Sequence, residues 1–157
     1  MPVRLDHIFI CTAAGAPAAE RLRQFGLTEG SPNQHPGQGT ACRRFFFRNF
    51  MLELIWIENA SDVQSEQTRT TRLWERCSAS AASPFGVILG PDTTSENACP
   101  FPSWDYRPKA MPDLRVQIAT GTTIEEPMWC YIERARAPAD APVDRRQPLD
   151  QDRKSVV

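Results

Sequence analysis

The fold is decided by the stretch His35-Pro-Gly-Gln-Gly-Thr-Ala-Cys-Arg-Arg-Phe-Phe-Phe-Arg-Asn-Phe-Met-Leu-Glu-Leu-Ile-Trp-Ile57. A polar loop with two glycines leads into an aromatic segment, and a second apolar segment follows Arg48-Asn49. Two such segments separated by a short turn predict a β-hairpin. Glu53 lies in the middle of the returning strand, where a buried carboxylate needs a partner.

A two-residue loop at Arg48-Asn49, with Asn49 tolerating a left-handed conformation, fixes the pairing of the two strands. It places Arg44 opposite Glu53, and directly opposed residues share one face of a sheet. A loop of odd length would instead place Arg43 there. One face then forms a semi-polar floor, and the other is almost entirely apolar and predicts a helix packed on it. The floor carries Cys42, Arg44, Phe46, Met51, Glu53 and Ile55; the apolar face carries Arg43, Phe45, Phe47, Phe50, Leu52, Leu54 and Trp56.

Length and composition restrict the classes of protein that remain. The 157 residues suffice for one domain or two fused halves. A net charge of −1 gives no electrostatic signature for nucleic acid or an anionic membrane, and no apolar run approaches a membrane span. Asp6 and His7 interrupt the N-terminal apolar segment, so we expect no signal peptide and a cytoplasmic location. Five widely spaced cysteines predict reduced thiols rather than disulfides or a zinc knuckle.

Outside the hairpin, alternation and turn signals predict the remaining elements. Residues 3–11 read as a strand with His7 and Phe9 on one face and Ile8 and Ile10 on the other. A helix over 16–25 and a short strand over 27–31 follow. Later segments are predicted as a loop over 59–67, a helix over 70–79, a buried strand over 85–89, a loop over 91–102, an edge strand over 104–107, and strands over 114–120 and 128–133. The polar residues beyond 134 are predicted to be mobile.

Several stretches resemble the glyoxalase-like branch of the vicinal oxygen chelate superfamily across residues 3–133. They are Leu5-Asp6-His7-Ile8-Phe9-Ile10, the helix end at Gly26-Leu27, residues 35–56, Ser83-Pro84-Phe85-Gly86-Val87 and Trp104-Asp105-Tyr106-Arg107-Pro108. The resemblance implies an α+β fold of two βαβββ-type modules, whose curved mixed sheet surrounds a cup and whose second module is abbreviated. The glyoxalase-like domain then covers 1–133, with module one at about 1–60, a linker helix at about 68–80, a degenerate module two at about 83–133, and a mobile or truncated tail at 134–157. A homodimer is also implied.

The resemblance also implies a metal site. In metal-using relatives, a His on the first strand and a Glu on the fourth strand bind a divalent cation, and His7 and Glu53 match these positions. Zn, Fe, Mn or Ni is the implied ion. The second module offers no His in its first strand and carries Trp129 or Tyr131 where an acid is expected, whereas catalytic zinc commonly has three protein ligands. In the alternative interpretation, Glu53 pairs with Arg44 and His7 is hydrogen-bonded nearby; the guanidinium group then repels a cation.

Other residues have both a functional and a structural interpretation. Arg44 either clamps a ligand carboxylate or only supports the sheet. His35 acts as acid, base or lid, or is a solvated loop histidine, and Gln38 is a candidate ligand-binding residue beside it. A final group of polar-tipped aromatic residues either lines a ligand pocket or packs in the core: Trp104, Tyr106, Trp129 and Tyr131.

Two functions remain. The first is a small-molecule-binding protein that holds a carboxylated or aromatic ligand in the cup without a cofactor. The second is a metal-dependent lyase, isomerase or dioxygenase acting on a substrate with vicinal oxygens, with Glu53 and His35 as catalytic residues and the metal as Lewis acid. The incomplete ligand set favours the binding protein. In both cases the expected partners are a small molecule and a second copy of the chain, not nucleic acid or a membrane.

Overall fold

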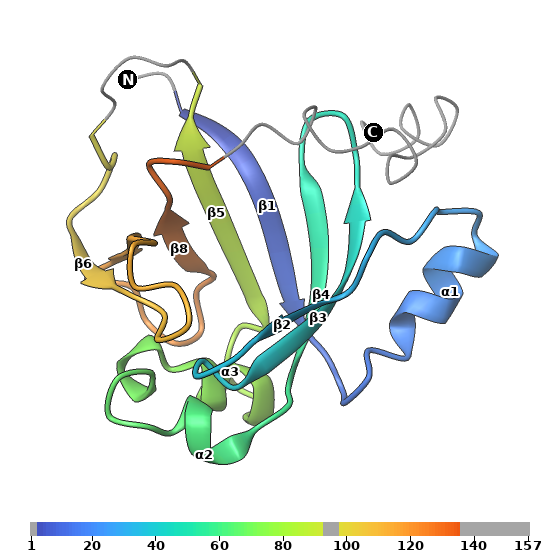
Figure 1. The fold of residues 1–157 in the computed structure, drawn as a ribbon, viewed down its shortest axis with the longest axis horizontal. Helices are drawn as coiled ribbons and strands as arrows, with labels where there is room; N and C mark the ends of the chain where they lie inside the picture. The colour runs from blue at the N-terminus through green and yellow to red at the C-terminus, as the bar shows by residue number, and fades with distance from the viewer. Residues whose placement is uncertain (1–2, 93–97, 136–157) are drawn as a thin grey trace.

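One mixed sheet of eight strands forms the framework of the protein, in the order β2-β3-β4-β1-β5-β8-β7-β6 (Figure 1). The structure is a computed structural model, and it describes residues 3–92 and 98–135. The strands are β1 (Val3–Cys11), β2 (Asn33–His35), β3 (Thr40–Phe46), β4 (Met51–Ile57), β5 (Phe85–Pro91), β6 (Ser103–Tyr106), β7 (Val116–Ala119) and β8 (Met128–Tyr131). The helices are α1 (Ala18–Gln24), α2 (Ala60–Val63), the 3-10 helix η1 (Arg69–Thr71) and α3 (Leu73–Ser78).

The sheet consists of two halves with the same central pairing. In the first half β1 runs parallel to β4, and in the second half β5 runs parallel to β8. The halves join where β1 pairs antiparallel with β5, at the middle of the sheet in Figure 1. Helices are few and lie beside the sheet, so the predicted α+β class with a curved mixed sheet is confirmed. The second half has no helix in its described part between β5 and β6, where the first half has α1 between β1 and β2.

The predicted register of the β3–β4 hairpin is confirmed. Arg44 pairs with Glu53, and the stacked rings of Phe47 and Phe50 flank the turn with centroids 4.7 Å apart. The expectation that Asn49 adopts a left-handed conformation is wrong. In the part of the chain that the structure describes, the residues other than glycine with positive φ are Ala16 and Arg72. The turn therefore keeps its length without a left-handed asparagine.

The apolar face of the hairpin packs against α1, as predicted. Ala19 of α1 is fully buried against Phe45, Phe47 and Leu54. Figure 1 shows α1 standing on the outer side of β3 and β4. This contact leaves the opposite, inner face of the hairpin free to form a site.

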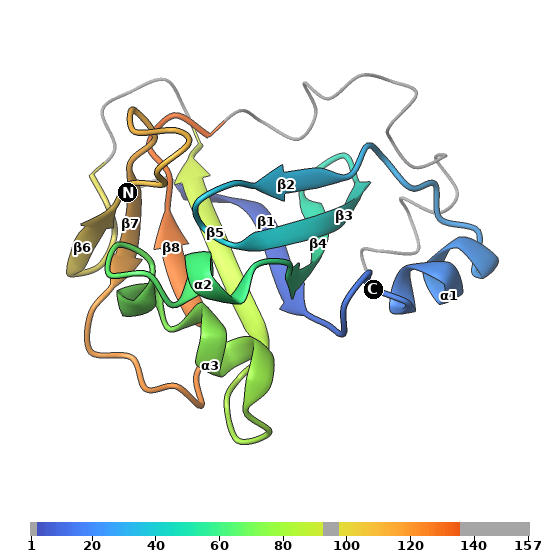
Figure 2. The ribbon, with the colours of Figure 1, turned by 60° about the horizontal axis from the view of Figure 1, so that its bottom comes forward.

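The inner face of the sheet carries a second apolar cluster that spans both halves of the sheet. Phe9 and Ile55 meet Ile88 and Ile118 there, and the segment between β4 and β5 covers one end of the cluster with Leu73. Figure 2 shows α2 and α3 together beside this end of the sheet. The alternation of apolar side chains along the strands thus produces two separate cores, one on each face.

Three expectations about local structure are wrong. The short strand lies at Asn33–His35 rather than 27–31, because the continuous pairing with β3 is made by these three residues, whereas Gly30 makes a single backbone bond to the carbonyl of Arg44. Residues 60–63 form α2 rather than loop, because the side chain of Asn59 caps the amides of Ser61 and Asp62.

The third correction concerns the cysteines. Cys11 at the end of β1 and Cys77 in α3 form a disulfide across a sequence separation of 66 residues, against the expectation of reduced thiols. The fold brings these distant thiols together at one end of the sheet, which spacing in the sequence does not indicate. Among the described residues, Cys42, Cys99 and Cys130 are free.

Two predicted segments fall partly or largely outside the described residues. The tail at 134–157 is described only to residue 135, and the loop at 91–102 lacks residues 93–97. None of the described helices has the length and apolar character needed to cross a membrane.

Candidate functional site

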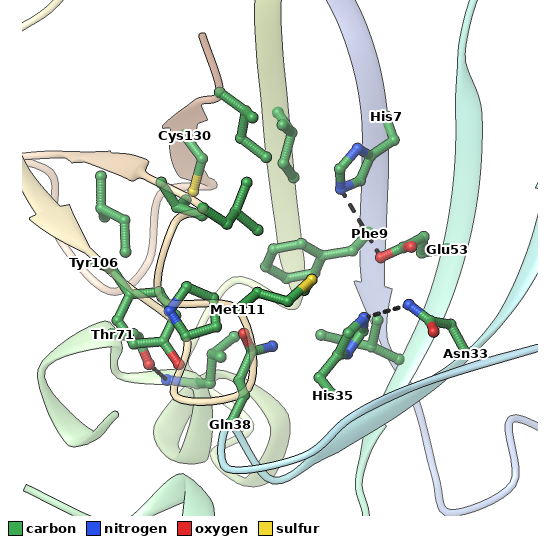
Figure 3. A pocket seen from close by; sticks show the side chains of 18 of the residues that line it. His7, Phe9, Asn33, His35, Gln38, Glu53, Thr71, Tyr106, Met111 and Cys130 are labelled. Carbon is green, nitrogen blue, oxygen red and sulfur yellow. Dashed lines mark hydrogen bonds and ion pairs between the residues drawn. The ribbon is translucent and has the colours of Figure 1, made fainter. Parts of the chain in front are cut away.

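A cavity of about 300 Å³ opens on the inner face of the sheet, between the two halves (Figure 3). A volume of this size is at the lower end of the range for small-molecule sites. Its apolar wall comes mainly from the second half and includes Ile88, Met111, Leu114, Val116, Ile118 and Met128. Its polar end comes from the first half and includes His7, Asn33, His35, Gln38 and Glu53.

His7 reaches the polar end because strand alternation places it on the same face of β1 as Phe9, and both residues line the cavity. The register between β1 and β5 shifts between Leu5 and His7, on the N-terminal side of this residue. Asp6 accepts a 2.7 Å hydrogen bond from Nδ1 of His7, which leaves Nε2 directed to Glu53, 3.9 Å from Oε2. Burial lowers the pKa of His7, but the charge of Glu53 and the bond to Asp6 outweigh it, so the pKa of His7 is raised.

Glu53 is a buried carboxylate with weak partners. The residue is 7% exposed, and the thiol of Cys42 donates to Oε1 over 3.7 Å. Within residues 3–92 and 98–135, no other hydrogen bond reaches this carboxylate, and His7 is its one ion-pair partner. Burial, followed by the nearby charge of Glu53, raises the pKa of Cys42 well above the ordinary thiol range. The Cys42 thiol is therefore protonated in the metal-free protein.

His35 enters the cavity from the turn between β2 and β3. Gly37 and Gly39 adopt φ values of 78° and 82°, which permit this tight turn. Nδ1 of His35 lies 2.9 Å from the hydroxyl of Thr40, and Nε2 lies 3.1 Å from the side-chain amide of Asn33. Burial lowers the pKa of His35, so the imidazole is neutral at neutral pH and can act as a ligand.

Arg44 lies opposite Glu53 in the ladder, but its guanidinium group does not bind this carboxylate. Nε and Nη2 donate to the carbonyl and the hydroxyl of Ser31, both over 2.9 Å, and the group stands over the ring of Phe46. Arg44 is not among the described residues that line the cavity. The cross-strand charge pair considered in the sequence analysis is therefore a pairing of backbones, not of charged groups.

The predicted aromatic residues separate into different environments. Tyr106 lines the cavity, and its hydroxyl lies 3.4 Å from that of Thr68. Trp104 contacts Tyr106 edge to face but does not line the cavity. Trp129 is 37% exposed, whereas Tyr131 is fully buried, and neither is part of the lining.

Of the remaining predicted site residues, the structure brings His7, Glu53, His35 and Gln38 to the cavity. Gln38 donates to the hydroxyl of Thr40 over 2.8 Å. Two side chains were not considered in the sequence analysis as site residues. Asn33 was missed because its strand was predicted elsewhere, and Cys42 was placed on the correct face without being connected to Glu53.

The second half has no counterpart of His7 for a steric reason. Phe9 pairs with Gly86, and the Phe9 ring occupies the space where a side chain at position 86 would begin. On β8, Cys130 lines the cavity in place of an acid, and burial raises its pKa to about 12. Of the two positions in the second half where ligands would be expected, one is thus a glycine beside Phe9 and the other a cysteine in the cavity lining.

Three potential metal ligands lie close together, two of them in the cavity lining (His35 and Glu53) and the third, Cys42, buried outside the lining. His35, Cys42 and Glu53 each offer one ligand atom, and these atoms all lie within 4.8 Å of one another. An imidazole, a thiol and a carboxylate are the groups that bind zinc in proteins. The weakly paired, buried carboxylate also fits a cation, so the donor set is compatible with a divalent metal.

An α+β fold with a curved mixed sheet, and a cavity on its inner face with histidines and a carboxylate at one end, define a protein of the vicinal oxygen chelate class. A family model described as a glyoxalase-like domain matches residues 5–118. The chain therefore belongs to the glyoxalase-like domain family of the vicinal oxygen chelate superfamily.

A solved structure described as a hypothetical protein from Staphylococcus aureus is similar to this chain, with a TM-score of 0.49 and 14% sequence identity. The likeness covers 85% of this chain and 59% of that chain. No curated protein matches the chain.

Proposed function

We propose that the protein binds a small molecule in the cavity, with an aromatic or otherwise apolar body against the second half and one polar group at the first half. The observation that carries this proposal is the asymmetry of the lining. Ile88, Val116 and Ile118 form one wall, whereas His7, His35 and Glu53 form the opposite end. Sites for small molecules combine an apolar lining with a few convergent polar groups in this way.

The ligand's polar group would meet His7, Asn33 and His35 rather than Arg44. The guanidinium group of Arg44 is already engaged by Ser31, so a role in binding a ligand carboxylate requires it to leave that contact. Despite burial, Glu53 and Asp6 raise the pKa of His7, so its ring is protonated more readily than an ordinary imidazole and can donate to a ligand. An oxygen of the ligand is therefore the group that we expect there.

A fluorescence titration with the aromatic probe anilinonaphthalene sulfonate tests this proposal. We expect saturable binding of one probe per folded chain, and weaker binding in Leu114→Trp, whose larger side chain fills the cavity. Trp129→Leu, on an exposed residue outside the lining, is the matched control and should bind as the parent does. Equal binding by the parent and by Leu114→Trp, both shown to be folded by circular dichroism, would contradict the proposal.

A second candidate function is a metal-dependent lyase, isomerase or dioxygenase acting on a substrate with vicinal oxygens. It is favoured by the approach of His7 Nε2 to within 3.9 Å of Glu53 Oε2, because these two residues occupy the positions implied by the family likeness. A divalent metal, when bound, would supply Lewis-acid polarisation of the substrate oxygens. His35, neutral at neutral pH, would accept a proton from the substrate as general base. Elemental analysis of the purified protein tests this function. A metal content well below one Zn, Fe, Mn or Ni ion per chain, in protein supplied with these metals, contradicts it.

We further propose a homodimer and a cytoplasmic location. Sheet edges at β2 and β6 and the exposed side chains of Phe25 and Phe85 support association with a second copy. Light scattering of the full chain tests the dimer, and a mass of 17.7 kDa would contradict it.

The cysteines bear on the location. The free thiols support a reducing compartment, whereas the Cys11–Cys77 disulfide favours an oxidising one.

A further inference from the structure

Three different ligand types stand on three neighbouring strands of the first half of the sheet. His35 ends β2, Cys42 lies in β3 and Glu53 lies in β4. One atom of each lies within 4.8 Å of the other two. We propose that these three side chains form a Zn²⁺ site built by the first half alone. The proposal deepens the metal-dependent candidate function and rests on it, with Cys42 as a ligand in place of His7 and with His35 as a ligand instead of a general base. It does not rest on ligand binding by the apolar wall.

The sulfur and the carboxylate are already spaced as ligands of one ion. At Zn–S and Zn–O bond lengths of about 2.3 and 2.1 Å, two ligands of a tetrahedral ion stand about 3.6 Å apart. Cys42 Sγ and Glu53 Oε1 are 3.7 Å apart. A zinc ion between them needs little movement of either strand, and the third ligand atom, from His35, is within the same small volume.

The environment of Glu53 favours a cation. Its carboxylate is buried, and in the part of the chain that the structure describes, its only hydrogen-bond donor is the weak thiol of Cys42. A buried charge without strong donors is costly, and the ion-pair contact with His7 is long at 3.9 Å, so a metal ion bonded directly to a carboxylate oxygen adds a stronger partner. The guanidinium group of Arg44 is held by Ser31, so it does not pair with Glu53 in place of an ion.

The types of ligand select the metal. A thiolate with an imidazole favours zinc over magnesium, calcium or manganese, which prefer oxygen ligands. Three protein ligands leave a fourth position open, as in catalytic zinc sites. Binding to Cys42 requires its thiol proton to leave, so the ion forms a Zn–S bond while one proton passes to solvent.

His7 stands beside this set and not within it. Its Nε2 lies 3.9 Å from the second carboxylate oxygen, Oε2, and His7 is not part of the three-residue cluster. The site therefore differs from the pair of His7 and Glu53 that the family likeness implies. In the proposed site Cys42 is essential for metal binding and His7 is not, whereas in the implied pair the reverse holds.

Cobalt is the probe that distinguishes the two sites, because a cobalt–thiolate bond gives a charge-transfer band in the near ultraviolet. The metal-free full chain, in a buffer without reductant, is titrated with Co²⁺ and then with Zn²⁺ as competitor. We expect one Co²⁺ per chain, the thiolate band, and its loss on addition of Zn²⁺. Cys42→Ser should lose the band and weaken Zn²⁺ binding by more than about 100-fold, beyond the effect of a supporting residue. His7→Ala should keep the band.

Cys99→Ser is the matched control, since it removes a free thiol outside the cavity lining and should leave the band unchanged. Glu53→Gln retains the thiol and should weaken binding, so the test does not depend on the folding of Cys42→Ser alone. No band in the parent protein, or a band that survives in Cys42→Ser, overturns the proposal. Binding of anilinonaphthalene sulfonate by the same metal-free protein reports the cavity separately, so failure of the zinc site leaves that result unaffected.

Discussion

The ring of Phe9 in β1 fills the space beside Gly86 in β5, where any larger residue would place its Cβ atom. This contact fastens the two halves of the sheet at the edge of the cavity, because Phe9 belongs to the inner apolar cluster and also lines the cavity. It also explains why the second half supplies no histidine at this position. The polar end is therefore confined to the first half.

The first prediction concerns this contact. Gly86→Ala should destabilise the fold by about 1–3 kcal/mol, because the added methyl group overpacks against the Phe9 ring. Chemical denaturation of the single variants and of the double variant Phe9→Ala/Gly86→Ala measures their coupling. The cost of Gly86→Ala should fall when Phe9 is already truncated; an unchanged cost would show that the two positions do not interact.

The second prediction concerns the link between β3 and the segment after α1. The guanidinium group of Arg43 bonds both oxygens of Glu29 over 2.6 Å, and Arg43 Nη2 also contacts Glu20 over 2.7 Å. Arg43→Lys loses the two-pronged contact with Glu29 and should cost about 1 kcal/mol of unfolding free energy. Arg115→Lys, in an exposed ion pair with Asp105, is the control and should change stability little. Equal effects of the two variants would contradict the importance of the bidentate geometry.

The third prediction concerns the two histidines. Nuclear magnetic resonance should give His7 a titration midpoint above the ordinary value of about 6.5 and His35 a midpoint below it. His7 then contributes stability below that ordinary value, and the contribution is lost as pH rises through its raised pKa. For His35, the unfolded chain takes up the proton first, so stability is lost as pH falls below about 6.5. Midpoints in the reverse order would contradict the contacts of His7 with Glu53 and Asp6.

The fourth prediction concerns the disulfide. Cys11 and Cys77 close a long loop, and loss of a cross-link of this length costs up to about 4 kcal/mol through the entropy of the unfolded chain. Reduction, or the double variant Cys11→Ser/Cys77→Ser, should therefore lower the melting temperature. The variant Cys99→Ser is the control. A melting temperature that does not respond to reductant would show that the bond makes no contribution in solution.

Much of the first half was predictable from the sequence because alternation and turn length fix a hairpin register. The pairing of Arg44 with Glu53, the two faces of β3 and β4, and the packing of α1 followed from this. The strand at Asn33–His35 could not be predicted in this way, because its three polar residues show no alternation of apolar and polar side chains. The hydrogen-bond partner of the Arg44 side chain could not be predicted either, since the register places a residue on one face of the sheet but does not determine which group its side chain binds.

The candidate site was predictable only in part. His7 and Glu53 were found through the family likeness, whereas Cys42 was placed on the right face and not recognised as a ligand. The apolar wall from β5, β7 and β8 depends on how the two halves meet, which no local pattern specifies. The disulfide has the same origin, since both cysteines come from segments that only the tertiary fold brings together.

Anomalous X-ray scattering at the zinc edge, from crystals soaked in zinc chloride, tests the central claim most directly. The account predicts a single strong peak on the inner face of the sheet, within bonding distance of Cys42 Sγ, a Glu53 oxygen and a ring nitrogen of His35. A peak bound to His7 and Glu53 without Cys42, or no peak on this face, would contradict it.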